Sequence, residues 1–432
     1  MSELPPRSWR ETTLGKAAEI VMGQSPPGYT YNQNGRGVPL INGPVEFGNR
    51  FPIKIQWTSA PSKTCLDGDI LFCVRGSTTG RINVSNDTYC IGRGLAALRG
   101  RDGISDTGFL ELLLRQLAVD ILEEARGSGS TFPSITGSRL AQRTFLLPPL
   151  LQQRKIAQIL ATVDNLIEKT EALVTKYQAI KQGMMHDLFT HGVDERGHLR
   201  PPYEEAPELY KQSEMGWIPK PWDCLGFGDF IVSGPQNGLY KSNSSYSVDG
   251  SPIVRIDGFY DGKLCDVKSF RRLHLTRAEL AAYMLEADDI LVNRVNSIDF
   301  VGKSAIVPQL LESTVFESNI MRLKVNRERL LPCFAIRLLC HHTTQRQFCQ
   351  SAKSAVAQAS INQSDIRRCF VAVPKLSEQI WLIERCRSIE CQIDWEKNYL
   401  VKLRRQKSGV MQDLLSGKVR VSVDEAEEFI HV

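Results

Sequence analysis

The sequence predicts a mixed α+β protein in which two globular α/β domains are joined by two long helices. Three observations lead to this prediction. The helix end "KQGMMHDLFTHGV" (Lys181–Val193) returns in the second half of the chain as "KSGVMQDLLSGKV" (Lys407–Val419). The segments before both ends carry apolar residues at helical spacing, and the remaining sequence alternates short β-type runs with Gly- and Pro-rich turns. A repeat of this length indicates two homologous halves, each consisting of a domain followed by a helix.

The repeat extends well beyond the helix end. The offset that places Lys181 on Lys407 also places Pro148 on Pro374 and Asp187 on Asp413 without a gap, and we call this match the repeat alignment. Upstream, "SITGSRLAQRTFLLPP" parallels "SINQSDIRRCFVAVPK", and "DGDILFCVRG" parallels "ADDILVNRVN". We therefore expect a pseudo-twofold internal repeat. The predicted segments are a first globular domain at 1–147, a first helix at 148–192, a linker at 193–221, a second globular domain at 222–373, a second helix at 374–418 and a C-terminal tail at 419–432.

Each globular segment is predicted to mix strands and helices. In the first, "VPLINGPVEF", "GDILFCVRG", "GRINVS" and "GLAALRG" have the character of strands, and "TGFLELLLRQLAVDILEEA" has that of an amphipathic helix. The second segment repeats this order with "SPIVRIDG", "DDILVNRV", "KSAIVP" and "NIMRLKV", then the helical "LLPCFAIRLLCHHTTQRQFCQSA". The linker between the halves is polar and rich in proline.

The two helices are predicted to pair with each other. Apolar residues of the first helix recur at alternating steps of three and four, and the second helix keeps a rougher version of this stripe. A helix with one apolar stripe is not stable alone in water, so an intramolecular coiled coil is the simplest way to bury both stripes. The alternative is that each helix packs on its own globular half. The residues predicted to pair are Ile156, Ile159, Val163, Leu166, Leu173, Tyr177 and Ile180 in the first helix, and Leu382, Ile389, Ile393, Leu400, Leu403 and Val410 in the second.

Bulk composition narrows the function classes. The chain has 432 residues, of which 42% are hydrophobic and 23% charged, and its net charge is +5. This mildly basic balance permits a nucleic-acid partner without requiring one. The 11 cysteines contain no CxxC pair, which favours reduced thiols in the cytoplasm over a disulfide framework or a metal ribbon. No run of 18 apolar residues occurs, so we expect no membrane span.

Catalytic and metal-binding motifs are missing from the sequence. "QSPPGYTY" comes near the loop with which adenine methyltransferases hold their target base, but a glycine follows its prolines instead of an aromatic residue. No GxxxxGK[ST] phosphate loop is present, and "RGSGSTF" follows a predicted helix rather than a strand. "CHHTTQRQFC" (Cys340–Cys349) has four potential ligands, but they occupy mixed faces of a helical pattern. We therefore predict no catalytic residue, no metal site and no cofactor in this chain.

Polar loops at matching positions of the two halves are candidates for DNA recognition. They are rich in Gly, Ser, Thr, Asn, Gln and Arg. Arginine can bind guanine with two hydrogen bonds, Asn and Gln can do so with adenine, and hydroxyl groups suit phosphates. The candidate DNA-binding residues are Arg75, Ser77, Thr78, Arg81, Ser130 and Thr131 in the first half, and Lys241, Asn293, Arg294, Asn296, Gln358 and Asn362 in the second.

The repeated segments resemble a known family. "LPPLLQQRKIAQILATVDNLIEKTEALVTKYQAIKQGMMHDLFTHGV" is similar to the central conserved region of the specificity subunit of type I restriction-modification enzymes, and "VPKLSEQIWLIERCRSIE" with "KLRRQKSGVMQDLLSGKV" is similar to the distal one. "SEMGWIPKPW" and "GDILFCVRG" also resemble that family. The resemblance implies that each globular domain is a target recognition domain for one part of a bipartite site on double-stranded DNA. It also implies that the helices form an antiparallel spacer.

Partners and cofactors follow from the same resemblance. It implies that two modification methyltransferase subunits dock on the chain and that restriction subunits, which act as translocases, can join them. S-adenosylmethionine, Mg²⁺ and ATP would then belong to those other chains. Two alternatives from other classes are a stand-alone DNA-binding regulator with tandem recognition domains, which would bind its site without a methyltransferase, and a single-chain enzyme, which would transfer a methyl group by itself.

Overall fold

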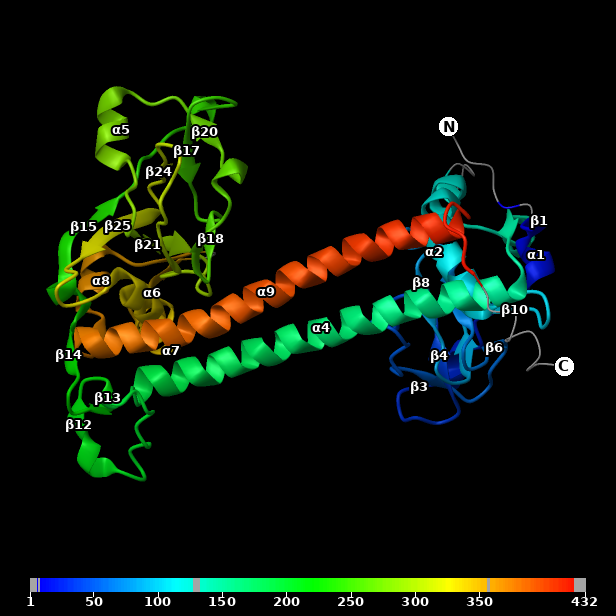
Figure 1. Ribbon diagram of the computed structural model, residues 1–432, viewed down its shortest axis with the longest axis horizontal. Coiled ribbons are helices and arrows are strands. Elements are labelled where there is room, and N and C mark those ends of the chain that lie inside the picture. Colours follow the sequence, from blue (N-terminus) through cyan, green and yellow to red (C-terminus); the bar gives the residue numbers. More distant parts are fainter. Residues whose placement is uncertain (1–5, 7, 127–132, 356–357, 423–432) are drawn as a thin grey trace. The chain divides into compact units, whose positions relative to one another are not determined.

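The structure is a computed structural model that describes residues 6, 8–126, 133–355 and 358–422 (Figure 1). It divides into two compact units. Unit 1 comprises Met1–Ala172 and Asn398–Val432, and unit 2 comprises Leu173–Lys397. Each unit therefore combines one globular segment with parts of both long helices.

Unit 1 is built on a four-stranded antiparallel sheet of order β2-β10-β7-β8 and a five-stranded sheet of order β3-β5-β4-β9-β6. A short antiparallel pair, β1 with β11, completes the strands of this unit. The elements before the first long helix are β1 (Arg10–Thr13), α1 (Leu14–Ala17), β2 (Ala18–Met22), η1 (Gly28–Thr30), β3 (Tyr31–Asn32), β4 (Val38–Ile41), β5 (Trp57–Thr58), β6 (Thr64–Cys65), β7 (Ile70–Cys73), β8 (Ile82–Val84), β9 (Tyr89–Ile91), β10 (Leu95–Gly100), α2 (Thr107–Arg126), α3 (Gly137–Ala141) and β11 (Thr144–Leu147).

The strand β7 explains why its sequence is apolar throughout. Side chains alternate between the two faces of a strand. Ile70 and Phe72 pack in the core beneath α2, whereas Leu71 and Cys73 pack in a second core against β4 and β9. A strand that is covered on both faces needs apolar residues at every position. Phe72 is fully buried, and burying a side chain of this kind stabilises the fold by roughly 2 kcal/mol.

Unit 2 repeats this architecture with extra strands. Its sheets have the orders β15-β25-β21-β23-β19-β18, β16-β20-β17-β24 and β22-β27-β26, with the pairs β14-β28 and β12-β13. Its elements between the long helices are η2 (Pro207–Leu209), β12 (Tyr210–Ser213), β13 (Gly216–Pro219), β14 (Asp223–Gly226), η3 (Phe227–Phe230), β15 (Ile231–Asn237), η4 (Asn243–Ser245), β16 (Tyr246–Ser247), β17 (Ser251–Val254), β18 (Phe259–Tyr260), β19 (Gly262–Leu264), η5 (Val267–Ser269), β20 (Arg272–Leu273), α5 (Arg277–Tyr283), β21 (Ile290–Asn293), β22 (Val295–Asn296), β23 (Ser304–Ile306), β24 (Val315–Phe316), β25 (Ile320–Val325), α6 (Pro332–Cys340), α7 (His342–Ser351), β26 (Lys353–Ala355), β27 (Gln358–Ser360), α8 (Gln363–Arg368) and β28 (Phe370–Val373).

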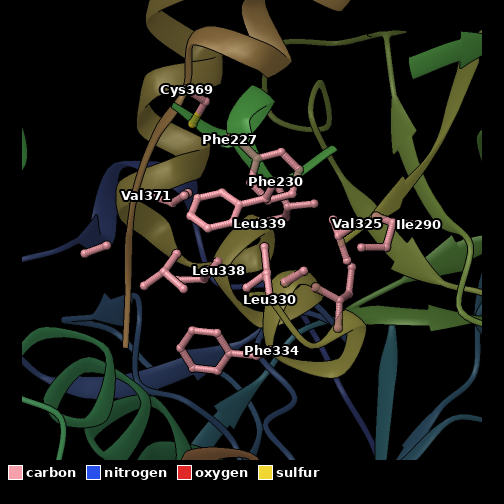
Figure 2. Packing of buried hydrophobic residues seen from close by; sticks show 14 of the residues in the cluster. Phe227, Phe230, Ile290, Val325, Leu330, Phe334, Leu338, Leu339, Cys369 and Val371 are labelled. Carbon is pink, nitrogen blue, oxygen red and sulfur yellow. The ribbon is translucent and has the colours of Figure 1, made fainter. Parts of the chain in front are cut away.

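The two units share their connectivity as well as their strands. In unit 1 the strand β4 pairs in parallel with β9, and in unit 2 the strand β17 pairs in parallel with β24. The core of unit 2 also has the same plan, because Ile290 of β21 belongs to one buried cluster with Phe334 and Leu338 of α6 (Figure 2). The prediction of two α/β domains in a mixed α+β protein is therefore confirmed.

The two long helices are α4 (Leu150–Thr190) and α9 (Leu376–Leu415), which Figure 1 shows as the longest ribbons. In unit 1, Asp164 of α4 forms an ion pair with Lys407 of α9 at 2.5 Å. In unit 2, Lys181 of α4 forms one with Glu390 of α9 at 3.1 Å. The two pairs are equivalent, because the repeat alignment places Lys181 on Lys407 and Asp164 on Glu390.

The direction of pairing is antiparallel within each unit. In unit 1, Glu171 comes after Asp164 in α4, and its partner Arg404 comes before Lys407 in α9. In unit 2, Met185 comes after Lys181 in α4, and its sulfur lies 3.3 Å from the thiol of Cys386, which comes before Glu390 in α9. The prediction that the helices pair is confirmed in both units.

Burial along α4 differs in places from the predicted stripe. The predicted residues Leu166, Leu173 and Ile180 are 41%, 38% and 44% exposed, whereas Leu160 is fully buried and Thr170 is only 3% exposed. The Thr170 hydroxyl donates to the Leu166 carbonyl oxygen at 2.8 Å and is thereby satisfied. Leu166, Leu173 and Ile180 are thus more exposed than the other predicted residues of this stripe, and their part in the pairing stays a prediction.

The predicted stripe of α9 is more buried than that of α4. Leu382, Ile393 and Leu403 are buried, and Ile389 and Leu400 are half-buried. Val410 is 38% exposed, whereas Cys386 and Glu396 of the same helix are buried. In α4, Ile156 is buried, and Ile159, Val163 and Tyr177 are half-buried.

The ends of the helices lie in the globular cores. Leu188 near the end of α4 belongs to the core of unit 2, and its repeat counterpart Leu414 near the end of α9 belongs to the core of unit 1. Just beyond the helix ends, Gly192 and Gly417 have positive φ angles of 63° and 72°, a conformation that glycine adopts without strain. The repeated helix end is thus a docking segment that each unit receives from one of the two helices.

Two glutamines fix the starts of the helices. Gln153 is fully buried, and its amide donates to the carbonyl oxygens of Ile104 and Pro148 while its side-chain oxygen accepts from the Asp106 N–H. Gln379, its counterpart in the repeat alignment, makes the same three hydrogen bonds, to the Arg329 and Pro374 carbonyl oxygens and the Leu331 N–H. Each helix is therefore joined to the loop that leads into α2 or α6.

The predicted linker contains ordered structure in unit 2. The strands β12 and β13 form a hairpin, and Ile218 packs in the core. Arg200 forms a nearly buried ion pair with Glu378 at 2.6 Å, and Glu378 also accepts from the Val193 N–H. Because its apolar residues are few, the segment resembled an extended linker in the sequence. In the part of the chain that the structure describes, no helix combines the length and apolar character needed to cross a membrane.

Candidate nucleic-acid interface

In unit 1, backbone hydrogen bonds bring the predicted recognition loops together. The Val74 N–H donates to the Gly94 carbonyl oxygen, and the Val74 carbonyl oxygen accepts from the Ile135 N–H, both at 2.9 Å. The Gly23 N–H donates to the Leu95 carbonyl oxygen at 2.8 Å. We call this meeting point of residues 23–32, 74–81, 91–95 and 133–136 the loop junction of unit 1.

Unit 2 forms the corresponding loop junction from residues 233–246, 293–299, 316–320 and 358–362. Its Arg294 N–H donates to the Asn319 carbonyl oxygen at 2.8 Å, and the Arg294 carbonyl oxygen accepts from the Ile361 N–H at 2.9 Å. The Gly238 N–H donates to the Ile320 carbonyl oxygen at 3.0 Å. These bonds correspond one by one to those of unit 1, so the two halves hold different loop sequences in the same backbone frame.

The loop junction of unit 1 presents several of the predicted residues to solvent. Arg75, Ser77 and Arg81 are exposed, and Thr78 is half-buried. Ser130 and Thr131 lie outside the described residues. The four segments of this junction contain no Asp or Glu, so an exposed guanidinium there has no neighbouring carboxylate in its own loop. This surface suits an anionic ligand such as a DNA phosphate.

In unit 2 the predicted residues have more varied surroundings. Gln358 is exposed, and Arg294 and Asn296 are half-buried. Asn293 is fully buried, so it lies beneath the surface of the junction. Asn362 is exposed, but its side-chain oxygen accepts from the Ser364 and Asp365 N–H groups and caps α8. Of the Asn362 side chain, only the NH₂ group remains available for a ligand.

Lys241 is held by an ion pair. Its ammonium lies 2.7 Å from a carboxylate oxygen of Glu279. The hydrogen bond from Lys241, together with those from the backbone and hydroxyl of Thr276, lowers the pKa of Glu279 to about 2. A DNA phosphate would have to compete with this carboxylate for Lys241.

Arg81 and its counterpart in unit 2 differ in accessibility. The backbone places Lys303 where unit 1 has Arg81, because the Asn293 N–H donates to Lys303 and the Cys73 N–H donates to Arg81. The Lys303 ammonium lies 3.8 Å from the Tyr260 ring centre and donates to the Ile256 carbonyl oxygen at 2.7 Å. Burial lowers the pKa of Lys303. The two junctions therefore present different chemistry from the same backbone position.

Sequence reasoning missed two tyrosines and one arginine. Tyr29 is 91% exposed and Tyr240 is 80% exposed, and they belong to the loops that follow β2 and β15, which are equivalent strands. Aromatic side chains within polar, glycine-containing loops ("PPGYTY" and "NGLYKS") were the available signal. Arg93 is also exposed, next to the point where its N–H donates to the Ser25 hydroxyl. Exposed aromatic and cationic groups together suit contact with nucleic acid.

Comparisons with known proteins agree with this geometry. Residues 6–177 match the family model of the type I restriction modification DNA specificity domain. The chain is 37% identical over 187 residues to the putative type I restriction enzyme MjaX specificity subunit of Methanocaldococcus jannaschii, a match that spans 43% of this chain and 43% of that protein. It is 23% identical over 419 residues to the MjaVIII specificity subunit of the same organism, spanning 96% of this chain and 94% of that protein.

Solved structures show the same fold. The S subunit of a type I restriction-modification system from M. genitalium superposes with a TM-score of 0.55 at 15% identity, covering 94% of this chain and 96% of that one. A chain from a study of complex assembly in the type I system gives a TM-score of 0.57 at 15% identity, covering 96% and 100%. Through the matched specificity domain in its first half and a relative aligned along both halves, the chain is similar to type I restriction-modification specificity subunits.

Proposed function

We propose that this chain selects the DNA sequence on which a type I restriction-modification complex acts. Each unit would read one part of a bipartite target on double-stranded DNA through its loop junction. The observation that carries the proposal is the repetition of the same backbone frame with different side chains, such as the exposed Arg81 in unit 1 and the half-buried Lys303, which lies over the Tyr260 ring, in unit 2. Two half-sites of different sequence require different side chains, which the same backbone arrangement can present in both units.

The proposed chemistry lies on other chains. Two modification methyltransferase subunits would dock on the two similar halves, because a pseudo-twofold repeat offers the same surface twice. Restriction subunits with translocase activity would complete the assembly. S-adenosylmethionine, Mg²⁺ and ATP would bind to those partners, and the complex would work in the cytoplasm. In unit 2, Leu173 and Ile180 support docking of one partner, because they lie two helical turns apart on one side of α4 and remain exposed. The repeat alignment places them on Tyr399 and Gln406, so this apolar pair belongs to unit 2 alone.

Mapping of methylated adenines tests this proposal. Genomic DNA is sequenced from the host with the gene intact, deleted, or carrying Arg75→Ala with Arg81→Ala. We expect one bipartite motif to be methylated with the intact gene and to lose methylation on deletion. The double variant should relax or abolish recognition of one half of that motif only. Arg154→Ala, an exposed arginine of α4, is the matched control and should leave the motif unchanged.

The same experiment separates the alternatives. A methylation pattern unaffected by deletion, combined with a gel-shift complex between the purified chain and a specific DNA, would favour a stand-alone regulator and contradict the proposal. Methyl transfer by the purified chain alone would point to a single-chain enzyme. Under our proposal the isolated chain binds DNA poorly, since its partners supply much of the phosphate contact.

A further inference from the structure

Three histidines of unit 2 gather at one point. His186 lies in the last turns of α4, His341 lies between α6 and α7, and His342 is the first residue of α7. One ring nitrogen of each lies within 4.8 Å of the others. The ring centres of His341 and His342 are 4.2 Å apart, and those of His186 and His342 are 5.9 Å apart. The cluster therefore joins two elements that are distant in sequence.

A break in the helix allows neighbouring histidines to face the same point. The sequence predicted one helix through this segment, with its potential ligands on different faces. Instead, α6 ends at Cys340, and His341 adopts extended backbone angles of φ −70° and ψ 142° before α7 begins. In a continuous helix consecutive side chains do not face each other. The prediction of a single helix was wrong here, and with it the argument against a common ligand site.

His341 is buried without a partner for one of its nitrogens. The residue is 9% exposed, and its Nε2 atom forms no hydrogen bond among the described residues. A buried polar atom without a partner costs about 1–3 kcal/mol, so such an atom calls for a ligand. The ring stacks on Phe189 of α4 at 5.6 Å, which fixes its orientation. Burial, with the nearby His342 and His186, also lowers the pKa of His341 to about 4, which leaves the imidazole neutral at pH 7.

The surroundings favour nitrogen ligands over carboxylates. The histidines line a cavity of about 990 Å³, and the carboxylates of Asp261, Glu390 and Asp394 line it as well. Glu390 is engaged by Lys181 at 3.1 Å and by Arg337 at 2.8 Å, and Asp394 by Lys263 at 3.1 Å. Hard cations such as Mg²⁺ and Ca²⁺ need several oxygen ligands, whereas imidazole suits zinc and related transition metals.

We propose that His186, His341 and His342 bind one zinc ion that links the end of α4 to the α6–α7 junction. Zinc accepts three histidine nitrogens at about 2.0–2.1 Å and leaves a fourth position for water. Small side-chain rotations would draw the three nitrogens to this distance. The ion would fix the orientation of the globular part of unit 2 on its helix. By the repeat alignment, Gln412 stands where unit 2 has His186, so the site would belong to one half only.

Zinc binding by the full-length chain tests this proposal. Purified chain is dialysed against a buffered zinc solution, and the bound metal is measured by mass spectrometry and titration calorimetry. We expect one zinc per chain. His186→Gln, which introduces the residue of the other half, and His342→Gln should each weaken binding at least tenfold, because even changes to residues that only orient a ligand cost about 10–100-fold. At a hundredfold excess over Kd, zinc should raise Tm by about 5–10 °C.

The control is His198→Gln, an exposed histidine of the same unit outside the cluster. It should bind zinc as the unaltered chain does. Equal zinc content and affinity in the unaltered chain, His186→Gln and His342→Gln would overturn the proposal, as would the absence of stoichiometric binding. Circular dichroism of each variant without metal shows whether it is folded. Since both substitutions are at exposed positions, weaker binding by either folded variant supports the site.

Discussion

Replacing Gln153 by methionine should destabilise unit 1 while leaving unit 2 intact. Methionine nearly preserves the side-chain volume but removes three hydrogen bonds, to Ile104, Pro148 and Asp106. Gln153 is fully buried, so water cannot replace these bonds. At about 1 kcal/mol each, the loss is about 3 kcal/mol. For a unit of this size that corresponds to a decrease in Tm of roughly 6–12 °C.

Thermal unfolding with hydrogen exchange measured by peptide mass spectrometry checks this result. Exchange should increase in peptides of unit 1 for Gln153→Met and in peptides of unit 2 for Gln379→Met, whose side chain makes the equivalent bonds. Gln158→Met, an exposed residue on the same helix, should change Tm by less than about 2 °C. A similarly small change for Gln153→Met would refute the reasoning that the glutamine joins helix to domain.

Three further predictions concern pH, DNA contact and spacing. With a chelator present, lowering the pH should destabilise unit 2, because the folded pKa of His341 of about 4 lies below its ordinary value of 6.5. The contribution of the neutral His341 to the free energy of unfolding is complete above pH 6.5 and is lost as the pH falls through 4, which amounts to a loss of up to about 3 kcal/mol. Urea unfolding of His341→Gln at pH 7.5 and 5 should lack this loss. Tyr29→Ala and Tyr240→Ala should leave Tm within about 1 °C but weaken DNA binding by the assembled complex about tenfold, measured by fluorescence anisotropy. As a control, Leu311→Ala, at a fully exposed position, should alter neither Tm nor binding. Unchanged binding by both tyrosine variants would exclude these loops from the interface. Deleting one heptad from each long helix, residues 165–171 and 391–397, shortens each helix by about 10 Å. The accepted gap between the half-sites should then decrease by about 3 base pairs. Methylome sequencing that finds the same gap would contradict a spacer role of the helices.

The sequence was most informative about features that occur in both halves of the chain. The repeat alignment located both halves, and the apolar runs "GDILFC" and "DDILVN" became β7 and β21 because both lie between two cores. Their parallel pairing partners, β4 with β9 and β17 with β24, could not be predicted. Such pairs bring together segments that are distant along the chain, and local sequence pattern does not contain that information.

The errors also have physical reasons. Burial along α4 was hard to predict, because Thr170 is buried and Lys181 half-buried although both residue types are typical of the surface, whereas Leu173 and Ile180 are exposed. A single apolar pattern cannot distinguish the face that meets the other helix from one that stays open. Among the candidate DNA contacts, the buried Asn293 and the capping role of Asn362 depend on backbone geometry. The residue types that were chosen for DNA contact also serve as caps and turns.

The composition of the two units has a consequence for synthesis on the ribosome. Unit 2 is one continuous stretch, Leu173–Lys397, whereas unit 1 needs both Met1–Ala172 and the segment from Asn398 onward. Leu414 and Leu415 complete its core, so the N-terminal domain emerges first but must wait for the end of α9. At a synthesis rate of about 5–20 residues per second this delay is roughly 10–50 seconds. The nascent chain should therefore complete the folding of unit 2 before that of unit 1, although most of unit 1 is synthesised first.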